Sequence, residues 1–118
     1  MPLFRQEDYN HHDVVIADFF RILALPVRVS ILKVLLKSKD WVSDREFYLL
    51  PLMPKSIDKH LHTMKLEKLI IREKRRGESF YKLNLENIAA ITINFEHFNN
   101  QLKHTIDTQI LEINHVSK

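Results

Sequence analysis

The sequence predicts a mainly helical α+β fold, with residues 1–118 forming one domain. Apolar residues recur every three or four positions over most of the chain, which is typical of amphipathic helices. The single glycine leaves room for few tight turns. One segment, residues 69–84, instead has β-branched and aromatic runs on both sides of a charged turn. A chain of 118 residues is long enough to bury one hydrophobic core but too short for two.

The composition narrows the class of protein. Hydrophobic residues make up 45% of the chain and charged residues 28%, a balance typical of a globular protein. The absence of cysteine excludes disulfides, thiolate metal ligands and a thiol nucleophile, and it fits a reducing cytoplasm. The first residues lack the apolar core of a signal peptide, and no run approaches the roughly 18 apolar residues of a membrane span. We therefore expect a cytoplasmic protein with no membrane partner.

Three helices are expected in the first half of the chain. Apolar spacing predicts a helix over residues 12–25 and a second that begins at Pro26, followed by a short extended link at residues 41–42. Ser43 and Glu46 have the spacing of a capping box, in which the serine accepts a hydrogen bond from the backbone N–H three residues on. A short third helix therefore begins there. It is expected to point three side chains inward: Phe47, Leu49 and Leu50.

Pro54 is well placed as the first residue of a fourth helix, over residues 54–68, with one apolar and one polar side. Together with the third helix it gives residues 43–68 the arrangement of a helix-turn-helix. The β-hairpin expected over residues 69–84, with Gly77 in its turn, then follows as a wing. The predicted architecture is a winged helix-turn-helix.

Asn84 is a good N-cap for a last helix, over residues 85–113, whose apolar residues form one long stripe. At 1.5 Å per residue this helix is about 42 Å long, longer than the body of so small a domain. We expect a second copy of the chain to cover part of the stripe, the alternative being a helix folded back across its own core. The expected homodimer uses the helices 12–25 and 85–113, with these interface residues: Val15, Phe19, Ile91, Phe95, Phe98, Leu102 and Ile106.

The charge is unevenly distributed along the chain. Residues 54–82 contain nine Lys or Arg and four acidic residues, a net charge of +5, so the remainder carries −2 of the formal total of +3. A basic segment on an otherwise slightly acidic protein is typical of a surface that faces phosphates. A solvated lysine-rich face is the alternative that charge alone leaves open.

Three segments in order resemble the motifs of the ArsR/SmtB family of transcriptional regulators. Residues 20–36, FRILALPVRVSILKVLL, match the pattern of that family's second helix. Residues 57–70, IDKHLHTMKLEKLI, match its reading helix, and RRG at 75–77 with FYKL at 80–83 matches its wing. The likeness covers about residues 16–85. It implies a winged-helix DNA-binding domain in which residues 54–68 form the reading helix.

Physical chemistry indicates which side chains would contact DNA. Short or basic residues near the start of a reading helix reach base edges, and cations beside it bind phosphates. Lys59 has the chemistry to donate to guanine, and Asp58 to accept from the amino group of cytosine. The candidate DNA-binding residues on the helix and the wing are Lys55, Ser56, Asp58, Lys59, His62, Lys74, Arg75 and Arg76.

Two residues depart from the family pattern. Lys68 stands where the family usually has a glycine that closes the reading helix. Asp58 replaces a serine that often faces phosphate, and a carboxylate there repels the DNA backbone. These departures bear on DNA affinity or site preference, and they allow a member of the family that has drifted toward another partner.

Many members of the family are metal sensors, and an alternative metal site of the family lies in the long helix and is shared by two subunits. His104 and Asp107 match half of that site, because residues three apart share a helix face. Ile91 and Ile93 stand where the other half would be, and His97 lies about 10 Å along the helix from His104. We therefore expect no metal and no other cofactor. The further histidines considered as ligands are His11, His12 and His115.

The leading hypothesis is a homodimeric repressor that binds double-stranded DNA at a palindromic operator, with no effector identified. The alternative is a winged-helix module whose basic face binds an acidic protein partner. An enzyme is not expected, because the sequence has no glycine-rich phosphate loop, no Ser/His/Asp spacing and no paired carboxylates.

Overall fold

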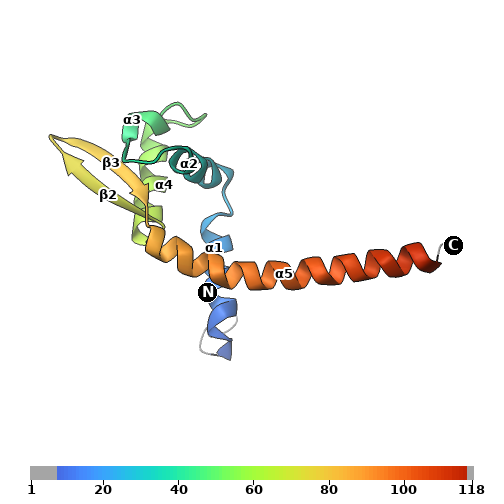
Figure 1. The fold of residues 1–118 in the computed structure, drawn as a ribbon. Coiled ribbons are helices and arrows are strands. Elements are labelled where there is room, and N and C mark those ends of the chain that lie inside the picture. Colours follow the sequence, from blue (N-terminus) through green and yellow to red (C-terminus); the bar gives the residue numbers. More distant parts are fainter. Residues whose placement is uncertain (1–7, 117–118) are drawn as a thin grey trace.

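The computed structural model describes residues 8–116, with side chains as far as Asn114. The helices are α1 (His11–Ile22), α2 (Pro26–Lys37), α3 (Asp44–Phe47), α4 (Pro54–Leu66) and α5 (Leu85–Val116), and the strands are β1 (Val42–Ser43), β2 (Ile70–Arg75) and β3 (Glu78–Leu83). Figure 1 shows the β2–β3 hairpin projecting from one side of the helices and the end of α5 from the other. This architecture confirms the predicted mainly helical winged helix-turn-helix.

The sheet is antiparallel and has the strand order β1-β3-β2. Val42 pairs with Tyr81, so the link before α3 is fastened to the wing. Arg76 (φ 51°) and Gly77 (φ 81°) form the hairpin turn, both in the left-handed region. A two-residue turn of this kind matches the twist of the two strands and favours glycine. A Cβ on Gly77 would meet no atom within 4 Å, so its backbone conformation, not space, is the constraint.

A single core joins the helix-turn-helix to the wing. Phe47 of α3 packs edge-on against Tyr81 of β3, with ring centroids 5.8 Å apart. One face of α4 is fully buried against them through Ile57, Leu61 and Met64. The remaining buried apolar residues are Ile22, Ile31, Leu35, Val42, Leu69, Ile70 and Ile91. The reading helix, the wing and the start of α5 therefore share one hydrophobic contact region.

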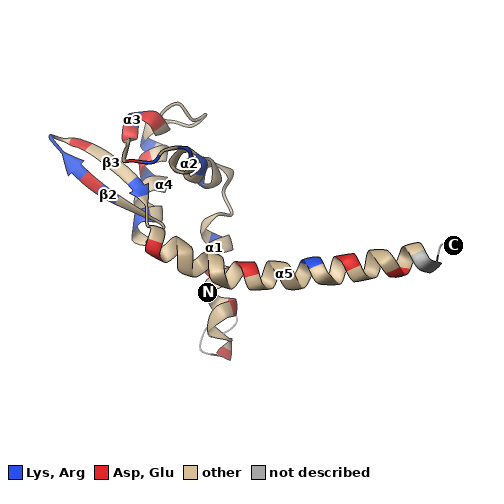
Figure 2. Cartoon of the chain, in the orientation of Figure 1, with Lys and Arg blue, Asp and Glu red and all other residues tan. Residues whose placement is uncertain are grey.

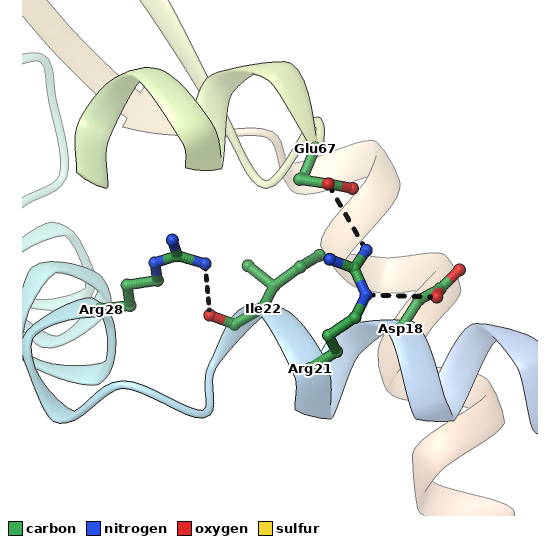
Figure 3. A network of polar contacts seen from close by, with 5 residues as sticks. All are labelled: Asp18, Arg21, Ile22, Arg28 and Glu67. Atoms are coloured by element: carbon green, nitrogen blue, oxygen red, sulfur yellow. Dashed lines mark hydrogen bonds and ion pairs between the residues drawn. The ribbon is translucent and has the colours of Figure 1, made fainter. Parts of the chain in front are cut away.

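The first helix ends at Ile22, three residues before the predicted end at Leu25. Leu25 is extended (φ −101°, ψ 126°), as expected of a residue that precedes a proline. The carbonyl of Ile22 accepts a hydrogen bond from Arg28, and Arg21 pairs with Asp18 and with Glu67 at the end of α4 (Figure 3). These contacts give the last turn of α1 polar partners and hold it to α2 and to the end of α4.

The third helix is one turn long, and two predictions about it are wrong. Ser43 is its N-cap, but the serine accepts from Arg45 two residues on, not from Glu46. The Ser43 hydroxyl instead donates to Glu78 of the wing, at 2.6 Å. Leu49 was expected to point inward and is 83% exposed, because the helix stops at Phe47 and the chain turns before Leu49.

The fourth helix, α4, which the family resemblance makes the expected reading helix, ends at Leu66, two residues before the predicted end at Lys68. Lys68 has φ 63°, and its N–H bonds to the carbonyl of Lys65 while Leu69 N–H bonds to that of Met64. This pair of hydrogen bonds is a Schellman motif, which normally places glycine in the left-handed position. Lys68 therefore adopts the left-handed backbone conformation for which the family usually has a glycine at this position.

The buried side of α4 is fastened to α2 by a polar contact as well. Arg28 Nε donates to His60 Nδ1 at 3.2 Å, and Arg28 also holds the end of α1. Burial, followed by the neighbouring guanidinium, lowers the pKa of His60. The hydrogen bond needs an unprotonated Nδ1, and the lowered pKa favours that neutral form of the imidazole. The contact is therefore stronger at neutral pH than in acid.

The last helix is longer than predicted, with 32 residues to Val116. Asn84 is its N-cap and accepts from Asn87 N–H, as expected. Its first turns pack against α1, where Phe20 and Phe95 meet edge to face at 5.4 Å. At 1.5 Å per residue the helix spans about 48 Å, which accounts for much of the 66 Å length of the molecule.

Replacement of Lys68 by glycine should raise the free energy of unfolding by about 0.5–1 kcal/mol. A side chain in the left-handed region costs about 1–2 kcal/mol, and the greater freedom of glycine in the unfolded chain offsets part of that gain. Urea unfolding measures the difference. Lys65→Gly, inside α4, is the control and should lower stability by about 1 kcal/mol. A loss of stability in Lys68→Gly would contradict the prediction.

His60 should make the fold less stable in acid. The unfolded chain, with an ordinary histidine pKa of about 6.5, binds a proton more readily than folded His60, so stability should fall as the pH drops below about 6.5. In His60→Asn, the amide oxygen can replace Nδ1 as the acceptor for Arg28 without titrating. Urea unfolding at pH 7.5 and 5.5 should show a smaller pH effect in this variant. The control is His62→Asn, an exposed position on the same helix; an equal change in both variants would count against this role of His60.

Candidate nucleic-acid interface

The polar side of α4 carries the five candidate base-reading residues of this helix. Lys55, Asp58, Lys59 and His62 are exposed, and Ser56 is half-buried. Their direction follows from the opposite face, where Ile57, Leu61 and Met64 are completely buried. The helix therefore presents a polar face to solvent, with two lysines, a histidine and one aspartate, beginning after its N-terminal proline.

Asp58 is not a free carboxylate. Tyr48, the C-cap residue of α3, donates its hydroxyl to Asp58 Oδ1 at 2.7 Å. This hydrogen bond is the main cause that raises the pKa of Tyr48 well above its usual value, with burial adding to it. The tyrosine thus remains a donor at neutral pH, and the carboxylate is held at one oxygen.

A hollow of about 220 Å³ lies at the surface where α3, α4 and the wing meet. Acidic, basic and hydroxyl groups from α3, α4 and the hairpin line it together: Asp44, Asp58, His62, Lys65, Arg72, Ser79 and Tyr81. Arg72 Nε donates to the hydroxyl of Ser79 at 3.1 Å, which holds that guanidinium against the neighbouring strand. The hollow has mixed charge, so it is no simple anion site.

Arg75 and Arg76 differ although they are adjacent on the wing. Arg75 donates to Glu73 at 2.9 Å, and its guanidinium lies 5.7 Å from the ring centre of Trp41 and 5.4 Å from that of Phe80. The same hydrogen bond lowers the pKa of Glu73. Both arginines are exposed, but Arg75 contacts Glu73 and the segment before α3, whereas Arg76 lies in the hairpin turn.

The basic residues are concentrated in one part of the molecule. Figure 2 shows lysines and arginines on the wing, α4 and α2, whereas the long helix carries few. Residues 85–116 contain four acidic residues and only one lysine. Lys74, at the end of the wing with Arg76, is exposed. The cationic surface thus includes the reading helix and the hairpin tip and stops where α5 begins.

Sequence reasoning missed several residues of this surface. Arg45 of α3 is exposed and pairs with Glu78 of the wing at 3.5 Å. Arg72 and Tyr48 act through contacts between elements, and no motif marks them. Trp41, which was assigned only to a link, has Arg75 over its ring. Only Trp41 had a signal in the sequence. It is an aromatic residue in a chain with a basic segment, and aromatic rings can stack on cations.

The seven expected dimer residues fall into two groups. Ile91 is 8% exposed within the chain's own core, and Val15 and Phe19 pack against that core. Phe95 is half-buried beside Phe20. The outer part of α5 leaves the other three exposed: Phe98, Leu102 and Ile106, at 38%, 45% and 53%. Ile110 extends this apolar row toward the end of the helix.

The histidines considered as metal ligands are spread along the surface. His97, His104 and Asp107 are all exposed on α5, and the side chain of His115 lies outside the part described. His12 instead bonds to Asn94 across the α1–α5 contact, and its neighbour His11 is exposed. Within the described residues no three His, Asp or Glu side chains gather to hold a metal. The same residues include no helix that is long and apolar enough to cross a membrane.

Comparison with solved structures identifies the family of folds to which this structure is similar. No protein-family model and no curated protein matches the sequence. The crystal structure of M. tuberculosis Rv0081 is 16% identical, with a TM-score of 0.58 over 83% of this chain and 99% of that one. An ArsR-like transcriptional regulator from Rhodococcus sp. RHA1 is 20% identical, with a TM-score of 0.60 over 80% and 89%. The ArsR family transcriptional regulator RHA00566 is 19% identical, with a TM-score of 0.61 over 80% and 94%. The chain therefore has the winged-helix fold of ArsR-family transcriptional regulators, as its motifs predicted.

Proposed function

We propose that this protein is a DNA-binding transcriptional regulator, and more specifically a homodimeric repressor of a palindromic operator. The observation that carries the proposal is the polar face of α4, where exposed Lys55 and Lys59 stand beside a basic wing. A helix of this kind fits the major groove, while the hairpin reaches the neighbouring backbone or minor groove. The similar solved structures, two of which are ArsR-type transcriptional regulators, support the same assignment.

The proposed contacts follow from the chemistry of each side chain. Lys59 reads a base edge in the major groove, and Lys55, Ser56 and His62 contact bases or phosphates around it. On the wing, Lys74 and Arg76 bind the backbone, and Arg75 supports the hairpin that carries them. Repression follows from occupying promoter DNA.

The proposed homodimer is supported by the outer half of α5. Leu102, Ile106 and Ile110 form an exposed apolar row beyond the body of the protein. Such a row is stabilised when a second copy covers it, because each buried Leu or Ile side chain contributes about 1.5–3 kcal/mol. Two copies joined there would carry two reading helices, which is the arrangement that a palindromic operator requires.

Selection of bound sequences from random duplexes tests the function. The purified protein should recover a palindrome whose half-sites are about 10 base pairs apart, one helical turn. The recovered site should keep its affinity advantage over random DNA as salt is raised, because base contacts do not depend on counterion release. Lys59→Ala should relax the preference at one position of each half-site by roughly tenfold, the value of a good base contact.

Two results would argue against this function. The first is a folded protein that binds all duplexes with equal affinity and releases all of them over the same range of salt. Such binding would come from charge alone and not from base contacts. Binding to an acidic protein but not to any duplex would favour the interaction module instead. An unchanged motif with Lys59→Ala would assign that lysine to a phosphate.

Substitutions in the exposed apolar row of α5 test the proposed dimer separately from DNA binding. Leu102→Glu or Ile106→Glu should shift the protein from dimer to monomer in sedimentation equilibrium, because a carboxylate would be buried against an apolar partner. Asn100→Glu is the control, since residues 100 and 102 are about 200° apart around the helix. A dimer that survives both substitutions, or a wild-type monomer at micromolar concentration, would refute this interface.

A further inference from the structure

Asp58 is the one acidic side chain on the exposed face of the reading helix. It lies in the second turn of α4, between residues that are placed to reach DNA. A carboxylate near phosphates is repelled, and one with free rotation would turn toward solvent. The hydrogen bond from the Tyr48 hydroxyl, at 2.7 Å, restricts this rotation by holding one carboxylate oxygen.

Tyr48 itself has a fixed position. Its side chain packs against the hydrophobic core, and it directly follows Phe47, which is completely buried. The start of the same short helix is held by Ser43, whose hydroxyl bonds to Glu78 of the wing. These contacts limit where the phenol oxygen can lie, so a side chain that it holds loses less freedom on binding than an unrestrained one would.

The remaining lone pairs of the carboxylate can only accept hydrogen bonds. In the major groove, guanine presents two acceptors and would repel it, and adenine places its N7 acceptor beside its amino group. Cytosine offers an N4 amino donor with no acceptor next to it on the same base. A carboxylate that is fixed among base-reading residues thus favours cytosine.

We propose that Tyr48 is a positioning residue for specificity, which fixes Asp58 so that its free lone pairs read one cytosine in each half-site. The inference rests on the proposed DNA-binding function and adds a residue of α3, outside the reading helix, to the determinants of its sequence preference. Tyr48 contacts no base in this account; it acts through Asp58. The high pKa of Tyr48 keeps its hydroxyl protonated over the working range of pH.

The test compares the sequences selected by four full-length proteins. Wild type should show cytosine at one position of each half-site, and Asp58→Ala should lose that preference. Tyr48→Phe keeps the ring and removes only the hydroxyl, so it should weaken the cytosine preference roughly threefold to tenfold, the value of one hydrogen bond, and leave the other positions unchanged. Affinity for random duplexes should not fall.

Tyr81→Phe is the matched control. It removes a tyrosine hydroxyl from the hollow that Asp58 also lines, but no hydrogen bond from Tyr81 to Asp58 is present among the described residues. Its selected motif should equal that of wild type, even if thermal unfolding shows that both tyrosine variants are less stable. A full cytosine preference in Tyr48→Phe would overturn the inference and leave the proposed function intact. A wild-type protein that selects no motif would overturn both.

Discussion

Burial of Ile57, Leu61 and Met64 fixes the rotation of α4 about its own axis, and the rest of the surface depends on that orientation. A helix whose apolar face is fully enclosed cannot turn without exposing it, so the polar face has one direction only. The Schellman turn at Lys68 then leads the chain directly into the hairpin. Reading helix and wing are therefore placed relative to each other by the core and by one turn of backbone, and no flexible linker separates them.

Specific polar contacts between elements also help to hold the wing in place, and the total charge of the surface does not show them. Exposed ion pairs contribute little to stability, but a guanidinium that lies over aromatic rings also gains cation–π attraction. Arg75, Trp41 and Phe80 form such a contact at the wing. Of the two adjacent arginines, Arg75 therefore links the hairpin to the segment before α3, and Arg76 is the one proposed to bind the DNA backbone.

Local signals made most of the fold predictable, and contacts distant in sequence account for what was missed. Gly77 in the turn and Asn84 at the start of α5 were identified because a hairpin turn and a helix N-cap each require a particular residue at a particular place. Leu49 was misplaced because one turn of helix gives too little periodicity to show which side faces the core. The bond from Tyr48 to Asp58 joins residues ten apart across a connection, and no sequence pattern encodes it. The assignment of residues to DNA remains a prediction from their chemistry.

The junction between α4 and α5 links the two parts of the proposed function. Asn87 Nδ2 donates to the carbonyl of Lys68 at 2.8 Å, and Asn84 N–H donates to that of Leu69 at 3.0 Å. The end of the reading helix is thus bonded directly to the first turn of the helix that carries the exposed apolar row. In a dimer joined through that row, the distance and angle between the two reading helices would be set mainly at this junction, because α5 itself is a continuous helix. A lysine, not a glycine, in the left-handed position makes the junction both strained and less free to move, so half-site spacing would be tightly defined.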